Sequence, residues 1–157
     1  MGKKILIPII LLISLLCTPS IICSQSFPDN LAGYADVTVS DEYNYDYSGY
    51  NAIDRQRQSD WAARGARNKW ILLNWPYPIN ISFIKLINRQ TGVFDPINSS
   101  ELILSDGSIF YVGTIKTHGR KLININREGI FWVKYLIHSG VNNVGLSEIL
   151  VIGADTK

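Results

Sequence analysis

Two short segments almost a hundred residues apart carry the side chains best suited to chemistry. The first, Asn51 to Asp54, is followed by Ser59 and Trp61, which brings a carboxylate, a hydroxyl and an indole into one short stretch. The second, Val144 to Gly153, places the carboxylate of Glu148 at the start of an apolar run. A hard cation such as calcium takes about six to eight oxygen ligands, many of them carbonyls of a tight loop. The spacing therefore permits an oxygen-lined loop site that requires neither thiolate nor imidazole.

These segments, together with two others, resemble the galactose-binding-like β-sandwich domains, which include the discoidin and coagulation factor type C domains and the family 32 carbohydrate-binding modules. The pieces that carry the resemblance occur in the family's order: Asn51-Ala-Ile-Asp54, Ser59-Asp60-Trp61, Trp70-Ile71-Leu72-Leu73 and Val144 to Gly153. Each piece is short, but four pieces in order extend the resemblance over residues 33–153. It implies an all-β fold for that range, an eight-stranded jelly-roll β-sandwich.

The resemblance also implies a structural calcium ion. Its ligands would be the carboxylates of Asp54 and Glu148, the hydroxyl or carbonyl of Ser59, and a carbonyl near Arg57. The sequence departs from the family at Arg55, where glycine is usual and where a positive φ would strain an arginine. Arg55 and Arg57 also bring positive charge close to the cation. In the alternative interpretation, Asp54 caps a turn and Glu148 is a solvated residue at a strand end.

Sugar-binding members of the resembled group use loops at one end of the sandwich. The residues that we expect to bind a ligand there are Arg89, Asn88, Arg64, Tyr45, Tyr47 and Asn143. Arg89 is the first candidate, because it follows a strand directly and its planar guanidinium can bond two adjacent hydroxyls. The tyrosines lie in a loop and combine an aromatic body with a polar tip. The alternative for Arg89 is a salt bridge to Asp95 or to another loop acid.

The four tryptophans tempt a sugar-stacking interpretation, but core packing is the simpler expectation. Trp70 and Trp132 lie in apolar runs, and the resembled domains bury an indole at the position of Trp61. Trp75 precedes Pro76-Tyr77-Pro78, and it is the one that we expect to be partly exposed.

The sequence contains no motif with a recognisable catalytic mechanism. His118 and His138 are the only histidines, and no serine, cysteine or carboxylate stands in a nucleophile or metalloprotease pattern. Asp54 and Glu148 are more simply metal ligands than the acid and base of a glycosidase. The sequence therefore predicts that the domain is not an enzyme.

The chain opens with the features of a secretory signal peptide over residues 1–24. Lys3 and Lys4 precede an apolar run from Ile5 to Leu16, and small and polar residues follow. Cleavage would remove both cysteines, Cys17 and Cys23. A retained membrane anchor and a lipoprotein site at Cys23 are the alternatives. Residues 25–32 would then form a linker, 33–153 the domain and 154–157 a tail.

The positive net charge of the chain belongs to this leader. Without Lys3 and Lys4, thirteen basic residues face thirteen acidic ones. A formally neutral protein offers no broad basic surface, so the sequence argues against nucleic-acid binding.

Short β-branched and aromatic runs between turn residues predict the strands. They lie near 35–40, 70–75, 79–88, 101–105, 108–115, 121–126, 130–138 and 144–152. Asp106-Gly107 predicts a tight hairpin turn within 101–115, and a second turn is expected at Arg127 to Gly129. The apolar alternation changes phase near Ser82-Phe83, which predicts a β-bulge.

The function that these patterns favour is that of a secreted, non-catalytic, calcium-stabilised domain that binds a glycan or polysaccharide through its end loops. The alternative is an adhesive or structural discoidin-like domain that binds a protein or a lipid head group at a cell surface. Val93-Phe94 is the candidate for an apolar membrane-contacting tip. Asn80 and Asn98 begin tripeptides that accept N-glycans in a eukaryotic host.

Overall fold

The computed structural model describes residues 29–91 and 95–155, and it is an antiparallel β-sandwich. The predicted signal peptide, Cys17, Cys23 and Val93-Phe94 lie outside the described residues. The elements are β1 (Asp29–Asn30), the 3-10 helix η1 (Ala32–Tyr34), β2 (Asp36–Val39), the 3-10 helices η2 (Tyr45–Tyr47) and η3 (Gly49–Ala52), β3 (Trp61–Ala62), β4 (Arg67–Asn88), β5 (Ile97–Leu104), β6 (Ile109–Tyr111), β7 (Arg120–Gly140) and β8 (Gly145–Asp155). The predicted eight-stranded all-β fold is confirmed. No helix of the described ranges is long and apolar enough to cross a membrane.

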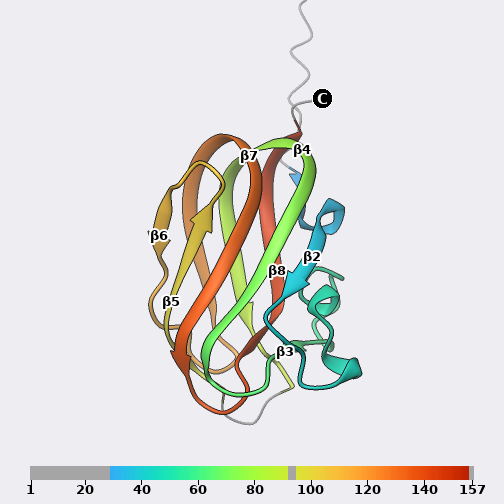
Figure 1. The fold of residues 1–157 in the computed structure, drawn as a ribbon, viewed down its shortest axis with the longest axis vertical. Coiled ribbons are helices and arrows are strands. Elements are labelled where there is room, and N and C mark those ends of the chain that lie inside the picture. Colours follow the sequence, from blue (N-terminus) through green and yellow to red (C-terminus); the bar gives the residue numbers. More distant parts are fainter. Residues whose placement is uncertain (1–28, 92–94, 156–157) are drawn as a thin grey trace, which may run out of the picture.

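Two long strands join the layers of the sandwich. The first half of β4 pairs with β2 and with the second half of β7, and the second half of β4 pairs with β8 and with the first half of β7. β5 and β6 extend the first layer beyond β7. Figure 1 shows β4 and β7 arching over at one end of the molecule. Hydrogen bonding is therefore continuous from one layer to the other.

This continuity corrects part of the predicted strand list. The runs 70–75 and 79–88 form one strand, and so do the runs 121–126 and 130–138. The turn expected at Arg127 to Gly129 is a bend inside β7, with positive φ at Asn126 and Gly129. The predicted bulge is confirmed, because the register of β4 shifts between Ile81 and Phe83. The hairpin is also confirmed, with Gly107 at φ 84° between β5 and β6.

The core lies between the layers and is built from the inward positions of every long strand. Ile71, Leu73, Ile84, Leu86 and Val151 are among its fully buried members. Apolar burial of this kind supplies the main stabilisation of the fold.

The tryptophans divide between the core and the surface. Trp61 and Trp75 are buried in the core, so the expectation of an exposed Trp75 is wrong; its indole N–H donates to the carbonyl of Leu31 at 2.9 Å. Trp70 and Trp132 are half-buried, so core packing describes them only in part.

Candidate functional site

The loops that connect the strands gather at the end of the sandwich opposite the arches of β4 and β7. They are the segment 41–60 between β2 and β3, and the connections that follow β3, β4, β6 and β7. Figure 1 shows these connections at one pole, with β3 beside them. All of the site residues that the sequence predicts lie in these loops or on the strand ends next to them.

The predicted metal ligands are brought together. The Ser59 hydroxyl donates to Asp54 Oδ2 at 2.7 Å, and the Ser147 hydroxyl lies 3.3 Å from the carbonyl oxygens of both Arg57 and Ser59. These bonds hold the 54–59 turn against the start of β8, where Glu148 follows Ser147. Two carboxylates and several carbonyls, all oxygen ligands, therefore converge on one place.

Glu148 is buried without a well-formed hydrogen bond. The residue is 3% exposed, and neither carboxylate oxygen has a hydrogen-bond partner of full geometry among the described residues, although the backbone N–H groups of Arg55 and Gln56 face it. Burial, together with the nearby carboxylate of Asp54, raises the pKa of Glu148 to about 7. The alternative interpretation, in which Glu148 is solvated and Asp54 caps a turn, is wrong for Glu148, which is buried. It is confirmed for Asp54, whose Oδ1 accepts from the Gln56 N–H at 2.7 Å and so caps the turn.

Arg55 adopts a backbone conformation that favours glycine. Its φ is 64°, in the left-handed region. The strain that the sequence predicts for an arginine at a positive φ is therefore present, at a cost on the order of 1 kcal/mol. The Arg55 side chain turns toward the carbonyl of Asn30, with 3.5 Å between Nη2 and the oxygen.

The loop 41–50 is tied down at several points. The Asp41 carboxylate accepts from the Arg64 N–H at 2.6 Å and from Lys69 at 2.7 Å, and the Glu42 carboxylate accepts from the Gly49 N–H at 2.8 Å. The Tyr43 N–H donates to the carbonyl of Ala62 at 2.7 Å. A loop held in this way presents its outward side chains in one arrangement, which lowers the entropic cost of binding.

Tyrosines project from this fixed loop. The side chain of Tyr45 is 88% exposed and that of Tyr43 is 48% exposed. The ring of Tyr43 meets the ring of Tyr47 edge to face, with centroids 5.8 Å apart, and the Arg64 Nε donates to the Tyr43 carbonyl at 3.2 Å. Of the predicted ligand-binding residues, Tyr47 and Arg64 therefore both contact Tyr43, and Tyr45 projects from the same loop.

Arg89 lies beneath this surface and is not exposed. Its guanidinium donates to Asp95 Oδ2 at 2.9 Å and to the Asn143 carbonyl at 2.7 Å, its Nε lies 3.5 Å from Asp60 Oδ2, and its Cζ stands 5.2 Å from the centroid of the Tyr47 ring. Only 7% of the residue is accessible. The expectation of an exposed strand-end arginine is wrong, and the alternative salt bridge to Asp95 is present. The physical reason is that three loops close over the end of β4.

Asn88 and Asn143 also bond within the protein. The Asn88 amide nitrogen donates to the carbonyls of Asp95 and Lys116, and its side chain has no exposed surface. In this structure the Asn88 side chain is therefore used within the protein, and its contact with a ligand stays a prediction. The Asn143 Oδ1 accepts from the Gly65 N–H at 2.9 Å. Both asparagines tie loops to one another.

Asp60 is the residue that sequence reasoning did not assign. It is buried, and its carboxylate accepts from the N–H groups of Gln90 and Thr91 at 3.1 Å each and from the Thr91 hydroxyl. Asp60 lies inside the Ser59-Asp60-Trp61 motif that carries the family resemblance. The acidic residue in this motif was the signal from which a buried partner of Arg89 could have been inferred.

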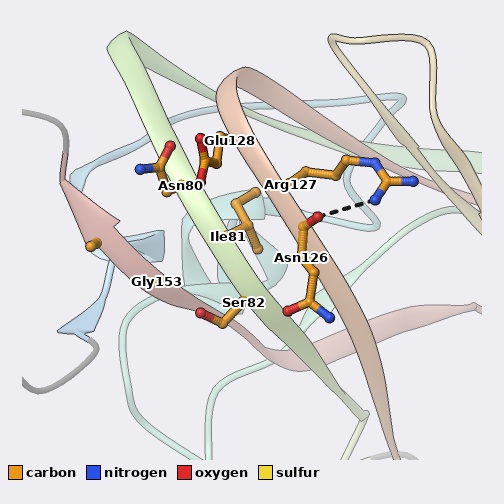
Figure 2. A pocket seen from close by; sticks show the side chains of 8 residues that line it. Asn80, Ile81, Ser82, Asn126, Arg127, Glu128 and Gly153 are labelled. Atoms are coloured by element: carbon orange, nitrogen blue, oxygen red, sulfur yellow. Dashed lines mark hydrogen bonds between the residues drawn. The ribbon is translucent and has the colours of Figure 1, made fainter.

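A separate hollow lies at the opposite pole. It has a volume of about 470 Å³ and is lined by residues that include Asn80, Ser82, Asn126, Arg127 and Glu128. Figure 2 shows the Arg127 guanidinium turned to the Asn126 carbonyl, at 3.0 Å. Arg127 also lies 3.0 Å from the Ser108 hydroxyl and 3.5 Å from Asp106, so its charge is used within the protein.

Solved structures with the same architecture come from vertebrate and bacterial proteins. A fucolectin from striped bass serum superposes with a TM-score of 0.69 at 18% identity, over 83% of this chain and 50% of that chain. An F5/8 type C domain from Bacteroides fragilis gives 0.65 at 14% identity, over 82% and 97%. The family 32 carbohydrate-binding module of Clostridium perfringens NanJ, in complex with galactose, gives 0.66 at 15% identity, over 80% and 98%.

At these identities the likeness establishes the fold, which is that of the galactose-binding-like β-sandwich domains. The chain spans half of the fucolectin chain and 28% of the SpGH29 chain, which it also matches. Residues 30–152 match the family described as "Domain of unknown function (DUF7402)". No curated protein sequence matches the chain.

Proposed function

We propose a carbohydrate-binding function for this chain, which belongs to the DUF7402 family. The observation that supports it most is the pair of exposed tyrosines, Tyr43 and Tyr45, on a loop fixed by Asp41 and Glu42. A rigid aromatic surface beside a hydrogen-bond donor such as Arg64 suits the mixed apolar and hydroxylated surface of a sugar ring. In this proposal the protein is secreted and non-catalytic, and it binds glycans at the loop end of the sandwich.

In this proposal Arg89 positions the site and does not contact the sugar. Its guanidinium holds the Tyr47 ring from below, and that ring in turn supports Tyr43. The ion pairs of Arg89 with Asp60 and Asp95 fix the guanidinium plane. The direct contacts belong to Tyr43, Tyr45 and Arg64.

A structural calcium ion also belongs to the proposal. The carboxylates of Asp54 and Glu148 and the carbonyls of Arg57 and Ser59 would hold it, and the unpartnered oxygens of Glu148 support the assignment. The ion would neutralise two neighbouring negative charges and lock the 54–59 turn onto β8.

The test of function is a glycan array on the purified protein, followed by substitution of Tyr45. The array should include galactose- and fucose-terminated glycans, because related folds in the lectins and modules above bind or are named for such sugars. Tyr45→Ala should weaken binding of the identified glycan roughly tenfold, since the lost aromatic contact is worth about 1.5 kcal/mol or more. Isothermal titration calorimetry measures the change.

Tyr34→Ala is the matched control, because Tyr34 is 64% exposed in η1 and lies outside the loop cluster. Its affinity should equal that of the parent. Equal affinity of the Tyr45→Ala and parent proteins would place the site elsewhere, and an array without any bound glycan would contradict the function itself.

A further inference from the structure

Two adjoining hollows form one groove on the outer face of β4 and β8. The first, about 370 Å³, is lined by Asn30, Arg55, Arg57, Lys85, Ile87, Glu148 and Leu150. The second, about 290 Å³, is lined by Arg57, Ile87, Gln90, His118, Gly119 and Arg120. Because Arg57 and Ile87 line both, the hollows adjoin, and we call them together the basic groove.

Strand register places the residues of the groove side by side. Ile87 on β4 lies between Glu148 on β8 and Arg120 on β7 as Cα partners, and Lys85 lies opposite Leu150. Neighbouring strands are about 4.8 Å apart, so these side chains stand in adjacent rows on one face. Arg55 and Arg57 come over the edge of this face from the 54–59 turn.

The cations of the groove form no ion pair within the described part of the protein. Lys69, Arg89 and Arg127 each form an ion pair with an aspartate. In contrast, Arg55, Arg57, Lys85 and Arg120 form no ion pair with an acidic side chain of residues 29–91 and 95–155. Arg55 does lie close enough to the Glu148 carboxylate for its charge to oppose the raised pKa of that group. Four cations against this one carboxylate leave the lining positively charged, which favours an anionic ligand.

The other lining groups narrow the class of anion. Gln90 can bond hydroxyl groups, and Ile87 and Leu150 form a half-buried apolar floor. Among the described residues, no tryptophan, tyrosine or phenylalanine lines either hollow for stacking on nucleobases. None of the large exposed apolar side chains of the described residues lines the basic groove, so the groove has no side chain suited to insertion into a lipid bilayer.

We propose that the basic groove binds an acidic glycan, a carbohydrate that carries carboxylate or sulfate groups. The groove lies on the face of the sandwich, whereas the tyrosines of the first site lie in the loop 41–50. The two sites therefore lie on different elements. In this proposal the loop end binds one glycan, and the basic groove is a second site that binds an acidic polysaccharide.

The experiment measures binding of the purified protein to heparin and to polygalacturonate, with dextran as the neutral polysaccharide. A chelator is present throughout, so the result does not depend on the calcium proposal. Affinity for a polyanion should fall as sodium chloride rises from about 50 mM to about 300 mM, because the ions screen the contact. The double substitution Arg57→Gln with Lys85→Gln should weaken binding at least roughly tenfold, since each removes a charge-assisted hydrogen bond.

The matched control is Arg67→Gln with Lys121→Gln, which removes the same charge from exposed residues outside the groove. It should change affinity less than about twofold, and thermal melting checks that both variants fold. Equal losses in the two double variants, or no binding to either polyanion, would overturn the proposal. Tighter binding to phosphatidylserine vesicles or to a single-stranded oligonucleotide would overturn it as well. The Tyr45→Ala protein should keep its heparin or polygalacturonate affinity, which separates this groove from the loop-end site.

Discussion

Arg89 carries more of the structure than its place at a strand end indicates. Its guanidinium lies among the carboxylates of Asp60 and Asp95, and all three side chains are buried. Removing one member of a buried ion network leaves the partner charges without compensation in a medium of low dielectric constant. The energy of this site therefore lies in the network and not in the single contact.

Replacing Arg89 by alanine should lower the free energy of unfolding by roughly 3 kcal/mol. Urea denaturation followed by tryptophan fluorescence measures the change, because Trp61 and Trp75 are buried. The control is Arg67→Ala, an exposed arginine whose loss should cost less than about 0.5 kcal/mol. Unfolding midpoints that coincide for the Arg89→Ala and parent proteins would show that the network contributes nothing.

At the scale of elements, two glycines allow the backbone of β8 to pack closely against its neighbouring strands. A Cβ on Gly153 would lie 1.8 Å from the Asn80 carbonyl oxygen, and one on Gly145 would lie 1.9 Å from the Trp61 carbonyl oxygen. β4 and β3 thus approach β8 at both ends more closely than any side chain allows. These glycines flank the Leu-Ser-Glu-Ile segment that carries Glu148.

Gly153→Ala should therefore destabilise the domain by roughly 3 kcal/mol, because the methyl group meets backbone atoms that cannot move independently. Differential scanning calorimetry should show a clearly lower Tm. Gly33→Ala is the control, since a Cβ there has no neighbour within 4 Å. A Tm for Gly153→Ala equal to that of the control would mean that β4 and β8 separate without cost.

The strands show how far the sequence determines elements. The phase change at Ser82-Phe83 predicts the bulge, because a period of two residues is a local property. The proline pair of Trp75-Pro76-Tyr77-Pro78 predicts a break, yet β4 continues. The prolines occupy the bend, where no β4 residue between Asn74 and Ile79 pairs with β7. The rule that proline interrupts strand pairing is therefore correct at Pro76 and Pro78, but it does not predict that the strand continues past them into the other layer.

The candidate site shows the same difference between features that short motifs predict and features that depend on the path of the whole chain. The oxygen cluster around Asp54 and Glu148 could be predicted because the motifs that hold these residues resemble a known family, whereas their spacing only permits such a cluster. The burial of Arg89 could not, since Asp60 and Asn143 reach it from loops 29 and 54 residues away. The basic groove could not be predicted for the same reason, because strand register brings Lys85 and Arg120 to one face and the 54–59 turn brings Arg57 over it.

At the scale of the whole molecule, the pKa of Glu148 links stability to pH and to calcium. The pKa is raised from 4.5 to about 7 in the folded state, so between these values the native protein binds more protons than the unfolded chain. In a chelator, the free energy of unfolding should therefore fall on the order of 2 kcal/mol as pH rises from about 4.5 to about 7. If the proposed calcium site is present, calcium should restore stability at the upper end, because a ligand that binds only the native state stabilises it.

Melting temperatures at about pH 5 and pH 7.5, with chelator and with calcium, test this linkage. Glu148→Gln is the control, since it removes the titrating group and should abolish both the pH-dependent loss and the calcium effect. Identical melting temperatures in chelator and in calcium at pH 7.5 would contradict the metal proposal.

The pairing of β1 with the end of β8 sets the direction in which the domain would face if it were tethered. Asp29 lies opposite Gly153, so the two ends of the described chain emerge together. β8 runs from the loop pole to this end over eleven residues, a span of about 30 Å. A neighbouring domain or anchor joined to either end would hold the molecule by the pole away from its tyrosines. The binding loops would point outward from that support, and the side wall with the basic groove would remain free to lie along a polymer.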